Sequence, residues 1–223
     1  MKRFVEIYQL AVLKAGGEKP LKEILPQTTS KKGLQATGDD RYLSSMTRCV
    51  FRAGFVWKVI DNKWPGFEAA FNQFNPLVVA SYSDEKLEEL AQDTRIVRNL
   101  SKIRATRDNA VFVLDVQKSH GSFGNLLAEW PQEDVVGLWL YLKQHGSRLG
   151  GNSGPMLLRL SGKDTFVLSN DVCAALVKHG FMKQLNPATK RDQLAAQDVF
   201  NHLHQESGRP LCELSKILAL SVD

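Results

Sequence analysis

The segment LKQHGSRLGGNSGPMLLRLSG, at residues 142–162, predicts two helices joined by a tight turn. Its glycines at 150, 151 and 154 allow the positive φ angles that other residues resist, and Asn152 and Ser153 are also common in turns. Pro155 stands where the first residue of the second helix is expected, because that position needs no amide hydrogen. Backbone N–H groups at such a turn and helix start suit a phosphate oxygen. Taken alone, the string also fits a plain connection between two packed helices.

A second segment of interest, KDTFVLSNDVCAALVKHG, follows at residues 163–180. Asn170 or Asp171 begins a helix there, with Val172, Ala175 and Leu176 on one side. A carboxylate at the start of a helix is most often a cap. From this pattern alone, capping is the simplest role for Asp171.

The rest of the chain predicts an all-α fold. Asp39 and Asp40 are expected to cap a helix that begins near Arg41, and the polar stretch 18–40 before it is expected to be irregular. Val, Ile and Thr never alternate with polar residues for long enough to indicate a sheet. Apolar spacing and turn residues predict the further helices at 4–15, 57–75 with an interruption near 64–66, from 83–84 onward, and at 99–118, 122–129, 132–145, 155–161, 170–178, 190–206 and 209–220.

Composition describes an ordinary globular protein. The 223 residues are 24% charged and 43% hydrophobic, which fits one domain or two small lobes sharing a cleft. A net charge of +5 suits a nucleic-acid partner without requiring one. The three cysteines are far apart and odd in number, so reduced thiols in the cytoplasm are expected. With no run of eighteen apolar residues, neither export nor membrane insertion is expected.

Together, the hairpin and the later aspartate resemble the helix–hairpin–helix DNA glycosylase superfamily. In that superfamily a Leu-Pro-Gly-Val-Gly type hairpin precedes a catalytic aspartate at the start of a later helix. Residues 149–153 correspond to this hairpin and Asp171 to the aspartate. The bifunctional members carry a lysine nucleophile just after the hairpin, where this chain has Pro155. The resemblance therefore implies a monofunctional enzyme without a lyase step.

A more specific resemblance, to the 3-methyladenine DNA glycosylase I family, spans roughly residues 42–116. It rests on AGFVWKVIDNKWPGFEAAFNQFNPLVVA at 53–80 and IVRNLSKIRATRDNA at 96–110. The family's Gly-Leu-Ser-Trp stretch, which reaches the DNA and lines the base pocket, corresponds to Gly54, Phe55 and Trp57. Its pocket glutamate corresponds to Cys49, so the choice of base is open. The family's zinc-binding residues have no counterpart, since no cysteine precedes Cys49 and His202 and His204 lack a matching pair, and no metal is expected.

The resemblance implies a helix–hairpin–helix DNA glycosylase fold with two helical lobes and a DNA-binding cleft between them. We expect residues 1–50 and 160–223 to form a terminal lobe, and residues 51–159 a central lobe that ends in the hairpin. The implied partner is double-stranded DNA containing alkylated bases, bound by a monomer associated with the nucleoid. No cofactor is expected, apart from a monovalent cation that the hairpin could hold.

Site residues follow from the chemistry of removing a base. An inserted apolar group offsets the unstacking of the base, and Gly54 with Phe55 is the candidate wedge. Electron-rich rings attract a cationic alkylated adenine, and Asp171 would stabilise the positive charge that develops on the sugar. Asp61 and Asp164 are alternative carboxylates. The expected base pocket is Tyr42, Cys49, Phe51, Trp57 and Trp64, and the expected phosphate contacts are Lys102, Arg148, Leu149, Gly150, Gly151, Asn152, Ser153, Gly154, Arg159 and Lys163.

Three functions remain open from the sequence. The first is a monofunctional N-glycosylase that excises alkylated bases of the 3-methyladenine type in base excision repair. The second is a non-catalytic helix–hairpin–helix protein that senses damaged DNA, which the missing pocket glutamate would suit. The third is a helical scaffold unrelated to DNA. For Phe55, Trp57 and Trp64, the alternative to a role in the site is that the side chain packs in the hydrophobic core.

Overall fold

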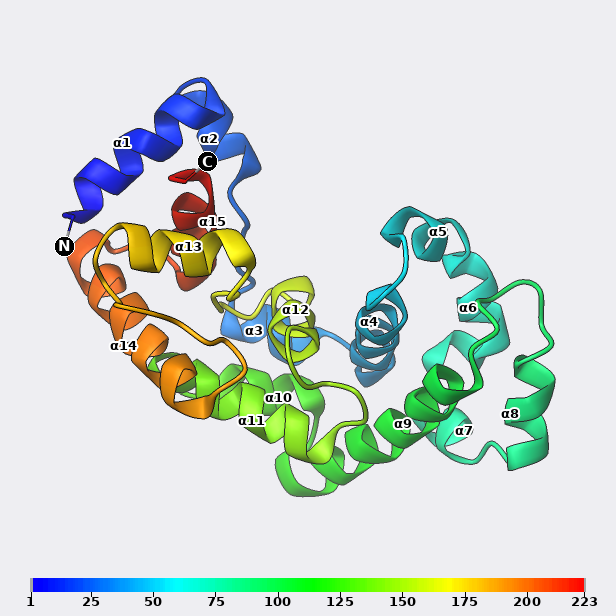
Figure 1. Cartoon of the computed structure of the whole chain (residues 1–223). Helices are drawn as coiled ribbons and strands as arrows, with labels where there is room; N and C mark the ends of the chain where they lie inside the picture. The colour runs from blue at the N-terminus through cyan, green and yellow to red at the C-terminus, as the bar shows by residue number, and fades with distance from the viewer. Residues whose placement is uncertain (1, 223) are drawn as a thin grey trace. The chain divides into compact units, whose positions relative to one another are not determined.

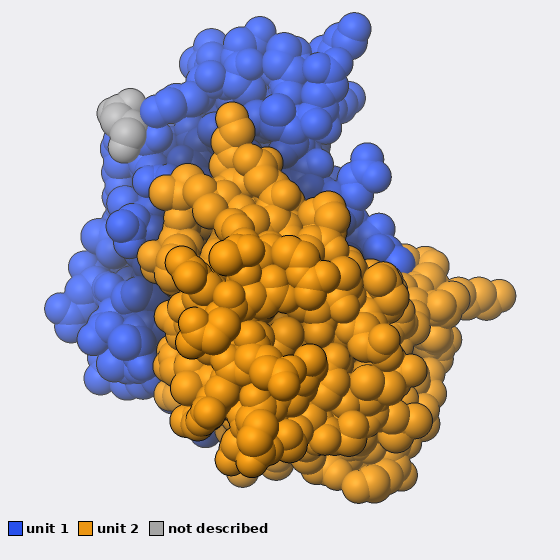
Figure 2. Space-filling view, turned by 90° about the vertical axis from the view of Figure 1, so that its right-hand side faces the viewer, with its two compact units in different colours: residues 1–29, 131–138, 162–223 blue, residues 30–130, 139–161 orange. Residues whose placement is uncertain are grey.

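A computed structural model describes residues 2–222, and every regular element among them is helical. The all-α prediction is therefore confirmed. The chain divides into two compact units, coloured separately in Figure 2: unit 1 comprises residues 1–29, 131–138 and 162–223, and unit 2 comprises residues 30–130 and 139–161. The division differs from the expected lobes, since residues 30–50 belong with the central unit and 131–138 with the terminal one.

Unit 1 is built around α15, which packs against α1, α13 and α14 (Figure 1). Leu214, Ile217 and Leu218 of α15 are buried at helical spacing, so this helix supplies much of the core of the unit. The helices of unit 1 are α1 (Phe4–Ala15), α2 (Glu18–Ile24), the short 3₁₀ helix η2 (Gln132–Asp134), α13 (Asn170–Lys178), α14 (Lys190–Ser207) and α15 (Leu211–Leu220).

Unit 2 is organised by α9 (Leu100–His120), the longest helix described, with α4, α7, α8 and α10 packed against it. Asn99 caps α9 through its side chain, as its position before the helix predicts. The other helices of the unit are α3 (Lys31–Ala36), α4 (Asp39–Arg52), α5 (Trp57–Asn62), α6 (Trp64–Ala70), the 3₁₀ helix η1 (Asn72–Phe74), α7 (Pro76–Ala80), α8 (Asp84–Leu90), α10 (Phe123–Glu129) and α12 (Ser153–Leu160), while α11 (Val135–His145) crosses the boundary at 138–139.

Two local predictions were wrong. The stretch 18–40 holds α2 and α3, whose buried anchors are single leucines, Leu21 and Leu34, in otherwise polar sequence. Asp39 lies in the first turn of α4 and not at its cap, which is Gly38. The Asp39 carboxylate instead accepts hydrogen bonds from Phe123 N and from the Gln117 side chain. It therefore joins α4 to α9 and to the start of α10.

Candidate functional site: a cavity between the wedge turn and the hairpin

Unit 2 contains a cavity of about 120 Å³, where the end of α4 faces α12. That volume is well above the space one water molecule needs, so a small planar group fits within it. Its walls come from three elements: α4, the start of α5 and α12. The lining residues are Cys49, Arg52, Ala53, Trp57, Asn152, Ser153, Met156 and Leu160.

The turn between α4 and α5 presents apolar side chains to solvent. Phe55 is 39% exposed, Val56 69% and Trp57 52%. Gly54, with φ of +75°, gives the turn a left-handed step that a larger residue resists. Adjacent exposed apolar groups of this kind are candidates for an interaction surface. We call residues 53–57 the wedge turn.

Trp57 already has a cation on one ring face. The Arg52 guanidinium carbon lies 5.1 Å from the ring centroid, within the range of a cation–π contact. Arg52 Nη2 also donates to both carboxylate oxygens of Asp61, at 2.6 and 2.7 Å. Asp61 is therefore engaged by Arg52, and the two charges offset each other beside the cavity.

Cys49, whose thiol is a weak acid, lines the cavity and remains neutral at physiological pH. It is 6% exposed, and burial raises its pKa to about 12 although Arg52 and Arg48 oppose the shift. The cavity lining contains no Asp or Glu. The residues that line the cavity therefore offer no carboxylate that could select a cationic base.

Three residues expected in the base pocket are core residues. Tyr42 is 1% exposed and donates to Leu34 O at 2.6 Å, and Phe51 is fully buried with its ring edge against Phe67. Trp64 stacks on Phe67, and its Nε1 donates to a Glu68 oxygen at 3.0 Å. They were expected in the pocket because their rings are electron-rich, whereas packing turns them into the core. Only Cys49 and Trp57 of the five expected residues line the cavity.

The sequence analysis missed four cavity residues: Arg52, Ala53, Met156 and Leu160. Cys49, Arg52 and Ala53 have i, i+3, i+4 spacing on α4, so choosing Cys49 was enough to point to the other two. Met156 and Leu160 stand three and seven residues after Ser153 on α12, on the same helical face. Ordinary helical spacing is the sequence signal of this face, and the same spacing is typical of a core face.

The hairpin turn forms, with a different set of backbone angles from the expected one. Two residues of the turn have a positive φ: Gly151, at 58°, and Arg148, at 60°. Gly150 and Gly154, which were also expected to have one, do not. Gly154 is required for another reason: a Cβ there would lie 2.9 Å from Leu149 O. Pro155 is the third residue of α12 and not the first, a position whose N–H also lacks an acceptor within the helix.

The N–H groups available to a phosphate are those of the turn. Ser153 N is used in a bond to Gly150 O at 3.2 Å. Gly151 N and Asn152 N donate to no acceptor within residues 2–222. Leu149 is 1% exposed, so its side chain anchors the turn while its backbone closes it. Gly151 and Asn152 are therefore the backbone groups of the hairpin best suited to an anion.

The basic side chains expected at phosphates differ in exposure. Arg148 is exposed, and its Nη2 donates to Ser101 Oγ at 3.1 Å. Arg159 is half-buried, whereas Lys163, which lies in unit 1, is 8% exposed. Lys102 is 6% exposed, too little for a surface contact. Of these four side chains, Arg148 is the exposed one, and its contact to a phosphate stays a prediction.

Asp171 lies in the first turn of α13, in unit 1, and it is exposed. Ser169 is the cap, because its side chain accepts from Val172 N. Within residues 2–222 the Asp171 carboxylate makes no hydrogen bond or ion pair. Asp164, in contrast, accepts from Leu211 N and Cys212 N and so caps α15. Of the three candidate carboxylates, Asp171 is the one left available for chemistry.

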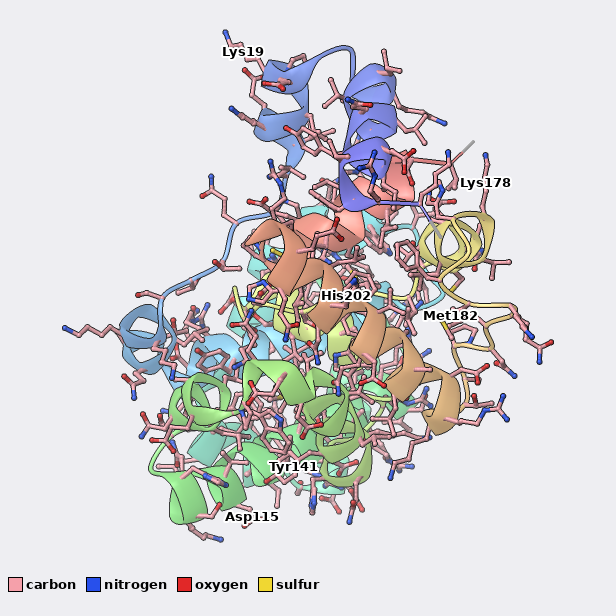
Figure 3. The ribbon with its side chains drawn as sticks, turned by 90° about the vertical axis from the view of Figure 1, so that its left-hand side faces the viewer. Lys19, Asp115, Tyr141, Lys178, Met182 and His202 are labelled. Carbon is pink, nitrogen blue, oxygen red and sulfur yellow. The ribbon has the colours of Figure 1, made fainter. Side chains whose placement is uncertain are left out.

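Metal ligands are not grouped in the described part of the chain: no three His, Cys, Asp or Glu residues lie close enough to hold an ion. His202 is exposed on α14 (Figure 3), and His204 Nδ1 instead contacts Arg209 O at 2.7 Å. Among the same residues, every helix is too short or too polar to cross a bilayer.

Comparison with known proteins identifies a matching family model and a similar protein. A family model described as methyladenine glycosylase matches residues 30–145, more than half of the sequence. DNA-3-methyladenine glycosylase 1 of Escherichia coli (strain K12) is 35% identical over 72 residues, which are 32% of this chain and 38% of that protein. The alignment thus spans well under half the length of this curated relative.

Solved structures share the fold. 3-Methyladenine DNA glycosylase I from Staphylococcus aureus aligns with a TM-score of 0.52 and 20% identity, over 61% of this chain and 80% of that chain. The 8-oxoguanine DNA glycosylase of Methanocaldococcus jannaschii aligns with a TM-score of 0.52 and 15% identity, over 95% of this chain and 91% of that chain. The second alignment reaches beyond the family match into both units.

Proposed function

The chain belongs to the methyladenine glycosylase family, and we propose that it is a monofunctional DNA glycosylase that hydrolyses the N-glycosidic bond of alkylated bases of the 3-methyladenine type. One observation carries this proposal. The wedge turn and the hairpin, which lie far apart in the sequence, line the same cavity: Ala53 and Trp57 belong to the first, and Asn152 and Ser153 to the second. A glycosylase needs these parts together, because it must hold the backbone, extrude the base and receive it.

Binding begins at the phosphates in this proposal. Gly151 N and Asn152 N donate to a phosphate oxygen, and the positive end of α12 adds to the attraction. Arg148, exposed beside them, contributes a second charge. These contacts carry no information about sequence, so they hold the enzyme on any duplex while it searches.

The base then leaves the stack. Phe55 enters the space that the base vacates and offsets part of the unstacking free energy, a few kcal/mol. The extruded base lies in the cavity against Trp57 and the thiol of Cys49. Since Arg52 is paired with Asp61 and Cys49 is neutral, shape and stacking contribute more to recognition here than charge does.

Hydrolysis needs one carboxylate in this scheme. The bond between the sugar C1′ and the base nitrogen breaks, the base keeps the electron pair, and a cationic alkylated base leaves as a neutral molecule. Asp171 stabilises the positive charge that develops on the sugar and orients a water, whose oxygen bonds to C1′ as its proton is lost to solvent. The reaction uses no cofactor or metal, and Pro155 stands where a lyase lysine would be needed.

The test is the release of free base. Wild-type protein is incubated with methylated duplex DNA, and the bases set free are separated and quantified. We expect 3-methyladenine to be released, and Asp171→Asn to lower the rate by roughly 100-fold or more because fixed charge near the reacting atoms is lost. Asp198→Asn, at an exposed aspartate of α14 in the same unit, is the matched control and leaves the rate unchanged.

Two results would contradict the proposal in different ways. Full activity in Asp171→Asn removes the mechanism but keeps the enzyme. Absence of release by the wild type, with DNA binding intact, leaves a non-catalytic sensor of damaged DNA. We propose double-stranded DNA as the partner of a monomeric cytoplasmic protein near the nucleoid, and its affinity must then fall steeply as salt rises.

A further inference from the structure

Lys102 closes the end of α4 from a neighbouring helix. Its side chain extends from α9 and is 6% exposed. The ammonium donates to Phe51 O at 3.2 Å and to Ala53 O at 2.5 Å. The last carbonyl groups of a helix find no N–H donor within the helix, and the helix dipole favours a cation beside them. Lys102 therefore fixes the point where α4 becomes the wedge turn.

The same ammonium also holds the ring of the wedge. Lys102 Nζ lies 4.5 Å from the centroid of the Phe55 ring, within the range of a cation–π contact. The Phe55 side chain still has 39% of its surface exposed. One side of the ring thus rests on a fixed charge while another remains free to insert. Gly54 between the two contacts would otherwise leave this turn with wide conformational freedom.

The charge on Lys102 is held without a carboxylate. Among residues 2–222, its ammonium donates to carbonyl oxygens and contacts aromatic rings, and it forms no ion pair. Burial lowers its pKa, and the positive charge of Arg148 adds to the effect. A buried charge without a counterion is unfavourable unless its hydrogen bonds are satisfied. Here the two carbonyl oxygens, at the end of α4 and in the wedge turn, and the rings of Phe51 and Phe55 stabilise the charge in place of a carboxylate, which ties the ammonium to this turn.

We propose that Lys102 is a positioning residue for base extrusion: it holds the wedge turn so that Phe55 occupies the place of the extruded base. The inference rests on the proposed glycosylase function and extends it. A purely structural cap predicts equal losses on every DNA substrate. A positioning role predicts that the excision rate falls more on a DNA substrate whose damaged base must first be unstacked.

The first experiment compares two duplexes in single-turnover reactions. In one duplex the alkylated base is paired with its complement. In the other, the gapped duplex, the opposite strand lacks a nucleotide at that position, so the alkylated base is unpaired and easier to unstack. We expect Lys102→Met to lower the rate about tenfold on the paired duplex and less than about threefold on the gapped one. Arg104→Met, at an exposed position of α9, is the matched control and leaves both rates unchanged. Equal losses on the two duplexes would overturn the proposal.

A second readout needs no chemistry. 2-Aminopurine placed beside a stable abasic analogue brightens when the stack is opened by an inserted side chain. We expect brightening with the wild type and little with Lys102→Met at saturating protein. Brightening by a wild type that releases no base would end the proposed function and leave this inference standing. Brightening by Lys102→Met equal to the wild type would overturn the inference alone.

Folding of the variants is checked by urea denaturation, and a double-mutant cycle covers the case in which Lys102→Met does not fold. Lys102→Arg keeps the charge with an altered reach, and Phe55→Ala removes the ring. If Lys102 acts through Phe55, Lys102→Arg changes the ratio of paired to gapped rates in the wild-type background and leaves it unchanged beside Phe55→Ala. Independent effects of the two changes would contradict the proposal.

Discussion

Asn109, on α9, and Ser147, in the hairpin turn, exchange two hydrogen bonds. Ser147 N donates to Asn109 Oδ1 at 2.7 Å, and Asn109 Nδ2 donates to Ser147 O at 3.0 Å. Asn109 is fully buried and lies seven residues after Lys102, two turns along the same face of α9. One face of α9 therefore holds the backbone of both the wedge turn and the hairpin turn.

Removing this pair tests how the hairpin is held. We expect Asn109→Leu to lower the free energy of unfolding by about 2 kcal/mol, since the Ser147 backbone loses both partners. Affinity for undamaged duplex falls about tenfold because the turn amides lose their fixed direction. Gln144→Leu, at an exposed position of α11, serves as control in urea denaturation and fluorescence anisotropy. A stable variant with unchanged affinity would show that the turn holds itself.

Arg148 combines a strained backbone with a proposed contact to DNA. Its φ of 60° is unfavourable for any residue with a Cβ, so Arg148→Gly is expected to raise the free energy of unfolding by about 1 kcal/mol. If Arg148 contacts a phosphate as proposed, the same change is expected to lower the slope of log affinity against log salt by about 1. Arg148→Lys keeps the strain and the slope. An unchanged slope in Arg148→Gly would place the side chain off the DNA.

Cys49 makes stability sensitive to alkaline pH. Its pKa is about 12 in the folded chain, against about 8.5 for an unperturbed thiol. The neutral form is favoured by folding, so this contribution to stability is complete below about pH 8.5 and is lost as the pH rises toward 12. Urea denaturation between pH 7 and 11 measures it. Cys49→Val should flatten the decline between pH 8.5 and 10, before Tyr42, whose pKa burial raises to about 12, begins to contribute.

A carboxylate at position 49 should change the preference for cationic bases. We expect Cys49→Glu to excise 3-methyladenine about tenfold faster than a neutral lesion, relative to wild type, which corresponds to roughly 1.4 kcal/mol of charge attraction. Arg48 and Arg52 are near enough to keep the new group ionised. Cys49→Gln, similar in shape and uncharged, is the control. Equal changes in the two variants would mean that size and not charge limits the pocket.

The helices and their order were predictable because apolar spacing, caps and glycine stops are local properties. Asn99 caps α9 through its side chain, and Gly16, with a left-handed conformation, ends α1 directly after the predicted range 4–15. The two missed helices, α2 and α3, each bury one leucine, too little to give a periodic pattern in so short a segment. The motifs were predictable for the same reason: a glycine-rich turn and an aromatic turn are recognisable from neighbouring residues.

Which side chains face the cavity was decided by packing between helices distant in sequence. Trp57 and Trp64 are seven residues apart and equally aromatic, yet Trp57 lines the cavity while Trp64 stacks in the core against Phe67. Neighbouring residues also do not reveal that Asp164 caps a helix, because its acceptor role depends on α15. The sequence by itself determined the helices, the hairpin and the wedge turn. Tertiary structure decided that α4 and α12 enclose one cavity, and that α9 supplies Lys102 and Asn109 to hold the turns on either side of it, since these contacts join residues tens of positions apart.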